Sequence, residues 1–72
     1  MNIKEIRKQL PIGAVKDIVK ISGVEYATVQ RFFRGENTKE NIKLMNVTAD
    51  YLEQYKTKEK EAIEKLQAVA SA

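Results

Sequence analysis

The chain lacks two residue types on which many catalytic and metal sites depend. Its 72 residues include no cysteine and no histidine. Without them the chain cannot form a typical zinc site, a Cys-His pair or a Ser-His-Asp triad. Its two serines, Ser22 and Ser71, have no histidine to act as a base. Disulfides are excluded as well, so a chain this short depends on its apolar core alone. We therefore expect no enzyme, no metal site and no cofactor.

Glycine and proline are scarce, and long apolar runs are missing. Three glycines and one proline interrupt a chain that is 43% hydrophobic and 32% charged. No charge-free run approaches the roughly 20 residues of a membrane span, and β-branched residues do not alternate as they do in strands. The composition predicts a folded all-α protein of the cytoplasm that avoids membranes and has no evident small-molecule ligand.

The first two helices are predicted from apolar spacing. Ile3, Ile6 and Leu10 share one face of a short helix that Pro11 ends. The second helix, over residues 12–21, is apolar almost all round and is expected to lie at the centre of the fold. Ser22 and Gly23 follow it, and glycine suits a tight turn.

The third helix is predicted from Glu25 to Phe33. Val29 and Phe32 face inward on this spacing, and Phe33 is also expected in the core. Gly35 then ends the helix, because glycine adopts the left-handed conformation at little cost.

The fourth helix begins after a polar break. Asn37 is expected to cap it, with Glu40 three residues later as in a capping box. Between Glu36 and the C-terminus there is no glycine or proline, so the helix either continues to about Ala70 or breaks near Thr57 into a fifth helix. The residues spaced to face the core are Ile42, Met45, Ala49 and Leu52, with Leu44, Tyr51 and Tyr55 beside them.

Positive charge is concentrated in the first two-thirds of the chain. Residues 1–45 hold nine basic and five acidic side chains, a net charge of +4, whereas residues 46–72 hold four and five, a net charge of −1. A polyanionic partner would therefore meet the first part, leaving the C-terminal third for another task.

Residues 18–31 carry the pattern of a helix-turn-helix. Gly23 permits the tight turn, and Val29, six residues later, falls on the buried face of the helix predicted from Glu25 to Phe33. The stretch resembles the lac repressor and lambda repressor/Cro families through Gly23, Val24, Tyr26, Thr28, Val29 and Arg31. The resemblance implies a lambda-repressor-like domain of four or five helices over residues 1–55, with the motif at about 14–34 and a helical extension over 56–72.

The same resemblance implies a DNA-binding surface. It points to a sequence-specific transcription regulator of double-stranded DNA, a repressor of the small Cro-like type found in phages and mobile elements. The residues expected to read bases are Tyr26, Ala27, Gln30 and Arg31. Those expected to contact the DNA backbone are Lys16, Lys20, Thr28, Arg34, Asn37 and Lys39.

A protein-interaction module on the same scaffold, such as an antitoxin or a phage-encoded adaptor, is the alternative. A shared basic face of Lys16, Lys20, Arg31, Arg34 and Lys39 would favour DNA. An exposed apolar patch around Tyr26 and Phe33 with acidic neighbours would favour a protein.

The C-terminal third carries a seam of apolar residues at coiled-coil spacing, interrupted by Glu59. One interpretation is that two chains pair through it as a homodimer, and the other is that it folds back onto its own core. The seam consists of Leu52, Tyr55, Ala62, Ile63, Leu66 and Val69.

Overall fold

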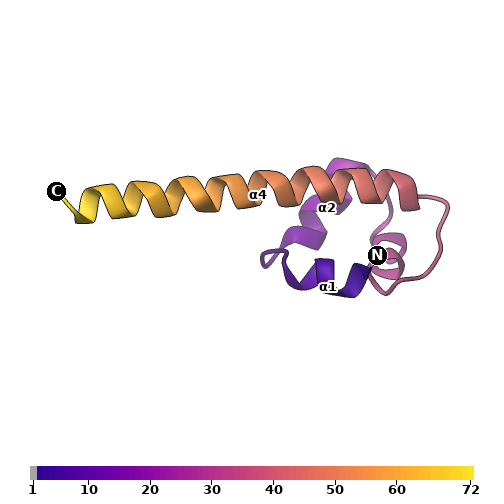
Figure 1. Cartoon of the computed structure of the whole chain (residues 1–72). Coiled ribbons are helices and arrows are strands. Elements are labelled where there is room, and N and C mark those ends of the chain that lie inside the picture. Colours follow the sequence, from indigo (N-terminus) through magenta and orange to yellow (C-terminus); the bar gives the residue numbers. More distant parts are fainter. Residues whose placement is uncertain (1) are drawn as a thin grey trace.

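The structure, a computed structural model, describes residues 2–72 and consists of helices joined by turns and loops. The four helices are α1 (Ile3–Lys8), α2 (Ala14–Ser22), α3 (Tyr26–Phe33) and α4 (Asn41–Ala70). The first three pack beside the beginning of α4, and the remainder of α4 projects away from them (Figure 1). The all-α prediction is confirmed for the described residues, with four helices there and no fifth.

A capped turn begins α1. The Asn2 side chain accepts hydrogen bonds from the backbone N–H groups of Lys4 and Glu5 at 3.1 and 3.3 Å. This satisfies two of the donors that a helix leaves free at its start. The helix ends at Lys8, three residues before Pro11, where the sequence predicted its end.

Only one side of α2 is buried, which corrects the expectation of a helix enclosed all round. Ala14, Ile18 and Ser22 face inward, whereas Ile21 is 64% exposed. Ile12 lies outside the helix and is fully exposed, because Gly13 takes a left-handed conformation at φ 85° and the helix starts after it.

Hydrogen bonds of Gly23 and of the buried Ser22 stabilise the turn between α2 and α3. Gly23 adopts φ 71°, and its N–H donates to the Val19 carbonyl at 2.9 Å. The buried Ser22 hydroxyl accepts from the N–H of Val24 at 3.1 Å. Val24 is itself buried, so the turn is anchored on the core.

The core lies where α2, α3 and α4 meet. Its largest fully buried side chains include Val29 and Phe33, and Phe32 contacts Phe33 edge to face with ring centres 5.0 Å apart. The inward positions predicted for α3 are thus confirmed, as is its end at Gly35, where φ is 89°. The buried apolar cluster comprises Ile18, Val24, Val29, Phe32, Phe33 and Leu44.

The start of α4 differs from the capping box predicted at Asn37 and Glu40. The helix begins at Asn41. The Asn41 side-chain oxygen accepts hydrogen bonds from the backbone N–H and the hydroxyl of Thr38, at 2.9 and 2.6 Å. The Thr38 hydroxyl in turn accepts from the Glu40 N–H at 3.2 Å. Asn37 is exposed and precedes this arrangement, so it is not the cap.

The buried face of α4 is also rotated from the predicted one. Leu44 and Thr48 are buried, and Val47 and Tyr51 are half-buried. The predicted stripe lies beside this face and is largely exposed, with Ile42 73% accessible. The spacing misled because two apolar stripes run side by side on this helix, and Leu44, Val47 and Tyr51 of the second stripe take the inward positions.

Two side-chain contacts tie α4 to earlier parts of the domain. The Tyr51 hydroxyl donates to Asp17 of α2 at 2.6 Å, and Lys56 donates to the Gln9 side-chain oxygen at 2.9 Å. Tyr51 bonds a carboxylate, which raises the pKa of its hydroxyl above the ordinary 10.0.

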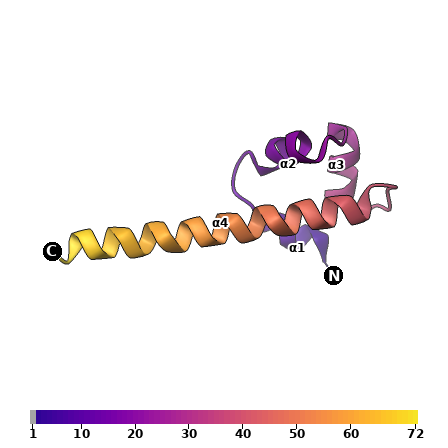
Figure 2. The same cartoon turned by 90° about the horizontal axis from the view of Figure 1, so that it is seen from above.

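Beyond Lys56 the chain makes no return to the core. α4 continues without a break at Thr57, and every residue from 56 to 72 is exposed (Figures 1 and 2). The seam residues beyond Lys56, which are Ala62, Ile63, Leu66 and Val69, therefore do not fold back onto the core. Within residues 2–72 no helix combines the length and apolarity that crossing a membrane requires.

Candidate nucleic-acid interface

The outward face of α3 gathers the residues expected to read bases. Ala27 and Arg31 are one helical turn apart and exposed, on the side opposite the buried Val29. Tyr26 and Gln30 form a second pair one turn apart, in which the Gln30 amide donates to the Tyr26 hydroxyl at 2.6 Å. Tyr26 is 52% exposed, so this polar pair stands at the surface beside Arg31.

A single carboxylate connects the two arginines of this region. Glu36 accepts from the Nε of Arg31 at 3.2 Å and from the Nε of Arg34 at 3.0 Å, one arginine on each oxygen. The hydrogen bonds from Arg34 and then Arg31 lower the pKa of the Glu36 carboxyl. All three side chains are well exposed, and such surface pairs are weak and exchangeable.

One flank of α3 is a polar hollow that collects three of the residues expected to contact a DNA backbone. Thr28 lines it from α3, and Asn37 and Lys39 line it from the loop before α4. Arg31 borders the same hollow, whose volume is about 410 Å³. Residues from α3 and from the loop that follows it are thus brought together along one edge of α3.

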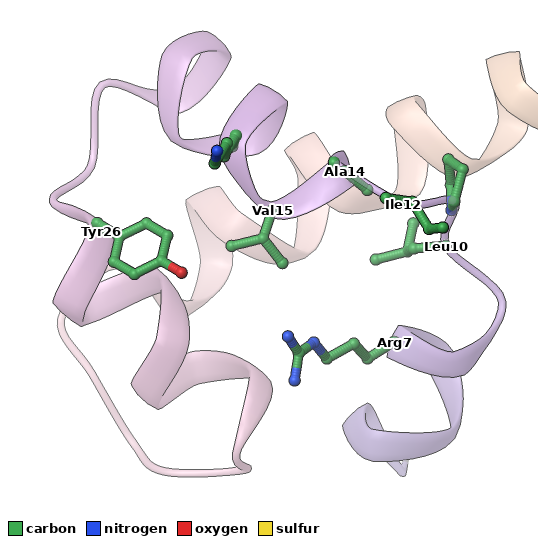
Figure 3. A pocket seen from close by; sticks show the side chains of 9 residues that line it. Arg7, Leu10, Ile12, Ala14, Val15 and Tyr26 are labelled. Atoms are coloured by element: carbon green, nitrogen blue, oxygen red, sulfur yellow. The ribbon is translucent and has the colours of Figure 1, made fainter.

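The other flank opens between α1, α2 and the start of α3. Lys16 and Tyr26 line a cavity of about 420 Å³ together with Arg7. Arg7 extends from α1 across this cavity toward α3, below Val15 and Tyr26 in the view of Figure 3. Lys16, which was expected to contact a DNA backbone, thus lines the same cavity as Tyr26.

Sequence reasoning missed Arg7 and its neighbours. Lys4, Arg7 and Lys8 occupy the polar side of α1, and all three line a further hollow with Arg34. The available signal was their spacing of three and four residues, which places them on one helix face beside Ile3 and Ile6. Of these cations Lys8 is partly compensated by Glu5 at 3.2 Å.

Not every expected residue joins this arrangement. Lys20 is exposed in the last turn of α2 and lines none of the three hollows around α3. Glu25 precedes α3, makes no capping hydrogen bond with its side chain and adds an exposed negative charge there. Phe33 is buried, so the apolar patch around Tyr26 and Phe33 that would favour a protein ligand does not form.

The expected seam on α4 is divided between two environments. Leu52 and Tyr55 are half-buried near the domain, whereas Ala62, Ile63, Leu66 and Val69 stand free on the projecting part. The Tyr55 hydroxyl donates to Glu59 at 3.2 Å, and this carboxylate raises the pKa of Tyr55. Comparisons with known protein families, curated proteins and solved structures find no match to this chain.

Proposed function

We propose that the chain binds double-stranded DNA sequence-specifically, as a small transcription regulator with a Cro-like helix-turn-helix. In this proposal α2 and α3 are the two helices of the motif, and α3 enters the major groove. The left-handed Gly23, the buried Val29 and the anchored Val24 support it, since a helix-turn-helix needs a tight turn and a buried contact at these positions.

One observation carries the proposal: the exposed face of α3 lies between two hollows that each hold basic side chains. Gln30 and Arg31 are at the centre, Arg7 and Lys16 on one side, and Lys39 on the other. A helix in the major groove needs base-reading groups along its exposed face and cations beside it for the phosphates. Arg31 suits a guanine and Gln30 an adenine.

The test is enrichment from a random duplex pool, followed by anisotropy titrations of the enriched duplex and of a shuffled duplex. We expect preference for the enriched site by a factor of about 10³ or more, with both affinities falling as salt rises. Failure to enrich any sequence, or binding that ignores sequence at every salt concentration, would refute the proposal.

A protein-binding role is the second candidate, because Glu36 already compensates Arg31 and Arg34. An acceptor on DNA must displace this carboxylate before either arginine is fully available. The variant Glu36→Gln distinguishes the two candidate functions. If the chain binds DNA, this variant should bind DNA more tightly. In a protein interface that uses the Arg-Glu-Arg cluster as it stands, the same change should weaken the complex.

Self-association through α4 is part of the proposed function. One small domain makes few contacts with DNA, and a two-fold dimer doubles them on a palindromic site. The exposed projecting part of α4 supports this.

A further inference from the structure

An unpartnered stripe runs along α4 beside the face that packs in the domain. Its spacing alternates between three and four residues, as in a coiled coil. Ile42, Ile63 and Leu66 are 73%, 50% and 69% exposed, so the described chain leaves much of the stripe uncovered. The full stripe is Ile42, Met45, Ala49, Leu52, Lys56, Glu59, Ile63, Leu66 and Ala70.

The part of the stripe nearest the domain forms one wall of an apolar cavity. Met45, Ala49 and Leu52 of α4 line about 190 Å³ together with Ile3 and Ile6 of α1. Among the described residues α4 packs mainly on α2 and α3. Met45 and Ala49 remain exposed on the side of α4 that faces this cavity. The far part of the same stripe carries the aliphatic side chains that such a cavity would accept.

We propose that a second copy of this chain covers the stripe, with the two α4 helices antiparallel and each Leu52 opposite the partner's Ile63. In this register Ala49 meets the partner's Leu66, and Met45 meets the partner's Ala70. Each far end thereby fills the cavity beside the other copy's domain. The inference deepens the self-association in the proposed function and requires no DNA.

The two charged positions of the stripe determine the direction of pairing. In the antiparallel register Lys56 faces the partner's Glu59, and the two-fold axis repeats the pair. In a parallel pair each Lys56 would face the partner's Lys56, and each Glu59 would face the partner's Glu59. Like charges would then meet along the stripe. Lys56 already leans to the α1 side of α4, where it donates to Gln9.

The flanking positions agree with this register. Glu53 lies beside the partner's Lys60, an additional pair of opposite charges, and Tyr55 lies beside the partner's Ala62. Shifting the register by seven residues in either direction would set Lys56 against an aliphatic residue, Leu52 or Leu66. Only the proposed register joins every charge of the stripe to an opposite one.

Charge reversal tests the pairing by sedimentation velocity. The dimer contains two Lys56–Glu59 pairs. Lys56→Glu and Glu59→Lys each turn both pairs into pairs of like charge, so each variant should weaken self-association at least tenfold. The double variant should return to the wild-type value, because the pairs are then restored with signs exchanged. Lys58→Glu, on the opposite side of α4, is the matched control and should leave the association unchanged. A monomeric wild type, or a double variant as weak as the singles, overturns the proposal.

The direction is tested by oxidative cross-linking, which the absence of cysteine makes unambiguous. Leu52→Cys and Ile63→Cys chains should form a disulfide with each other when mixed, and neither should link to itself. Circular dichroism first verifies that both variants keep the wild-type helix content. Self-linking of either variant would show parallel helices, and failure of the mixture to link would show another register, so both results overturn the proposal.

Discussion

Arg31 and Arg34 bond the same Glu36 carboxylate, but Arg31 lies within α3 and Arg34 lies just after it. Arg31 lies one turn after Ala27 on the exposed face, whereas Arg34 follows the last helical residue. Arg31→Ala should therefore relax preference at one base pair, at a cost of about 1–3 kcal/mol. Arg34→Ala should weaken binding to all sequences alike and lower the salt slope by about one. Anisotropy titrations on enriched and shuffled duplexes measure both, and equal, sequence-independent losses would contradict these roles.

Glu36 should oppose DNA binding. The hydrogen bonds from Arg34 and Arg31 lower its pKa, so the carboxylate is charged at neutral pH. In the proposed complex it therefore competes with the DNA phosphates for the two arginines. Glu36→Gln removes that competition and should raise affinity for enriched and shuffled duplexes several-fold. Glu64→Gln, on the projecting part of α4, is the control and should change neither affinity. Unchanged or weaker binding by Glu36→Gln would count against a DNA-facing role for the two arginines.

The Tyr51 hydroxyl should stabilise the α2–α4 contact in a pH-dependent manner. Its pKa is raised by the bond to Asp17, so the folded chain holds this proton more tightly than the unfolded chain does. The stabilisation is complete below the ordinary value of 10.0 and is lost as the pH rises through the raised value.

Urea unfolding of Tyr51→Phe should show a loss of about 1 kcal/mol at neutral pH. The difference from wild type should shrink at strongly alkaline pH. Tyr55→Phe loses only a bond within exposed α4 and should cost less. A Tyr51→Phe loss that stays constant through the tyrosine titration would contradict the assignment.

At the level of elements, the α2–α3 turn depends on backbone conformation at Gly23. An added Cβ would meet no atom within 4 Å, so the cost of substitution is the left-handed φ of 71° rather than a clash. Gly23→Val should destabilise the domain by about 1–2 kcal/mol, and Gly23→Asn by less, because asparagine tolerates this conformation. Thermal unfolding measures both, and an unchanged midpoint for the valine variant would show that the turn is not under this constraint.

The existence of most helices was predictable because their local signals agree. Apolar spacing sets the inward faces of α1 and α3, and Gly23 and Gly35 occur where left-handed turns follow helices. The shared exposed face of Ala27 and Arg31, which we propose reads bases, follows from the same periodicity, since both residues are opposite Val29.

Features set by tertiary contacts were not predictable in this way. Two neighbouring apolar stripes lie on α4, and only packing against α2 and α3 decides that Leu44 and Val47, with Thr48, face inward rather than Ile42 and Met45. The Thr38–Asn41 bonds displace the expected cap, because several polar residues compete there. Arg7 joins the α3 region only because α1 packs against α3.

At the scale of the whole molecule, the chain is a domain with a long helical arm, 51 Å in its longest dimension. Ending the chain after Lys56 removes only exposed residues and keeps the contact with Gln9. This truncation should cost less than about 1 kcal/mol, a shift of under about 4–8 °C in Tm, while abolishing self-association. Calorimetry and sedimentation measure the two effects. An unfolded product would contradict a domain confined to residues 1–55.

The central claim, that α3 reads bases in the major groove, can be tested with altered DNA. Replacing the guanine opposite Arg31 in an enriched duplex by 7-deazaguanine removes the N7 acceptor and leaves the base pair intact. We expect this to cost wild type about 1–3 kcal/mol and to cost Arg31→Ala almost nothing. If wild type binds the altered and unaltered duplexes equally at every guanine of the site, or if Arg31→Ala loses as much as wild type, the account is contradicted.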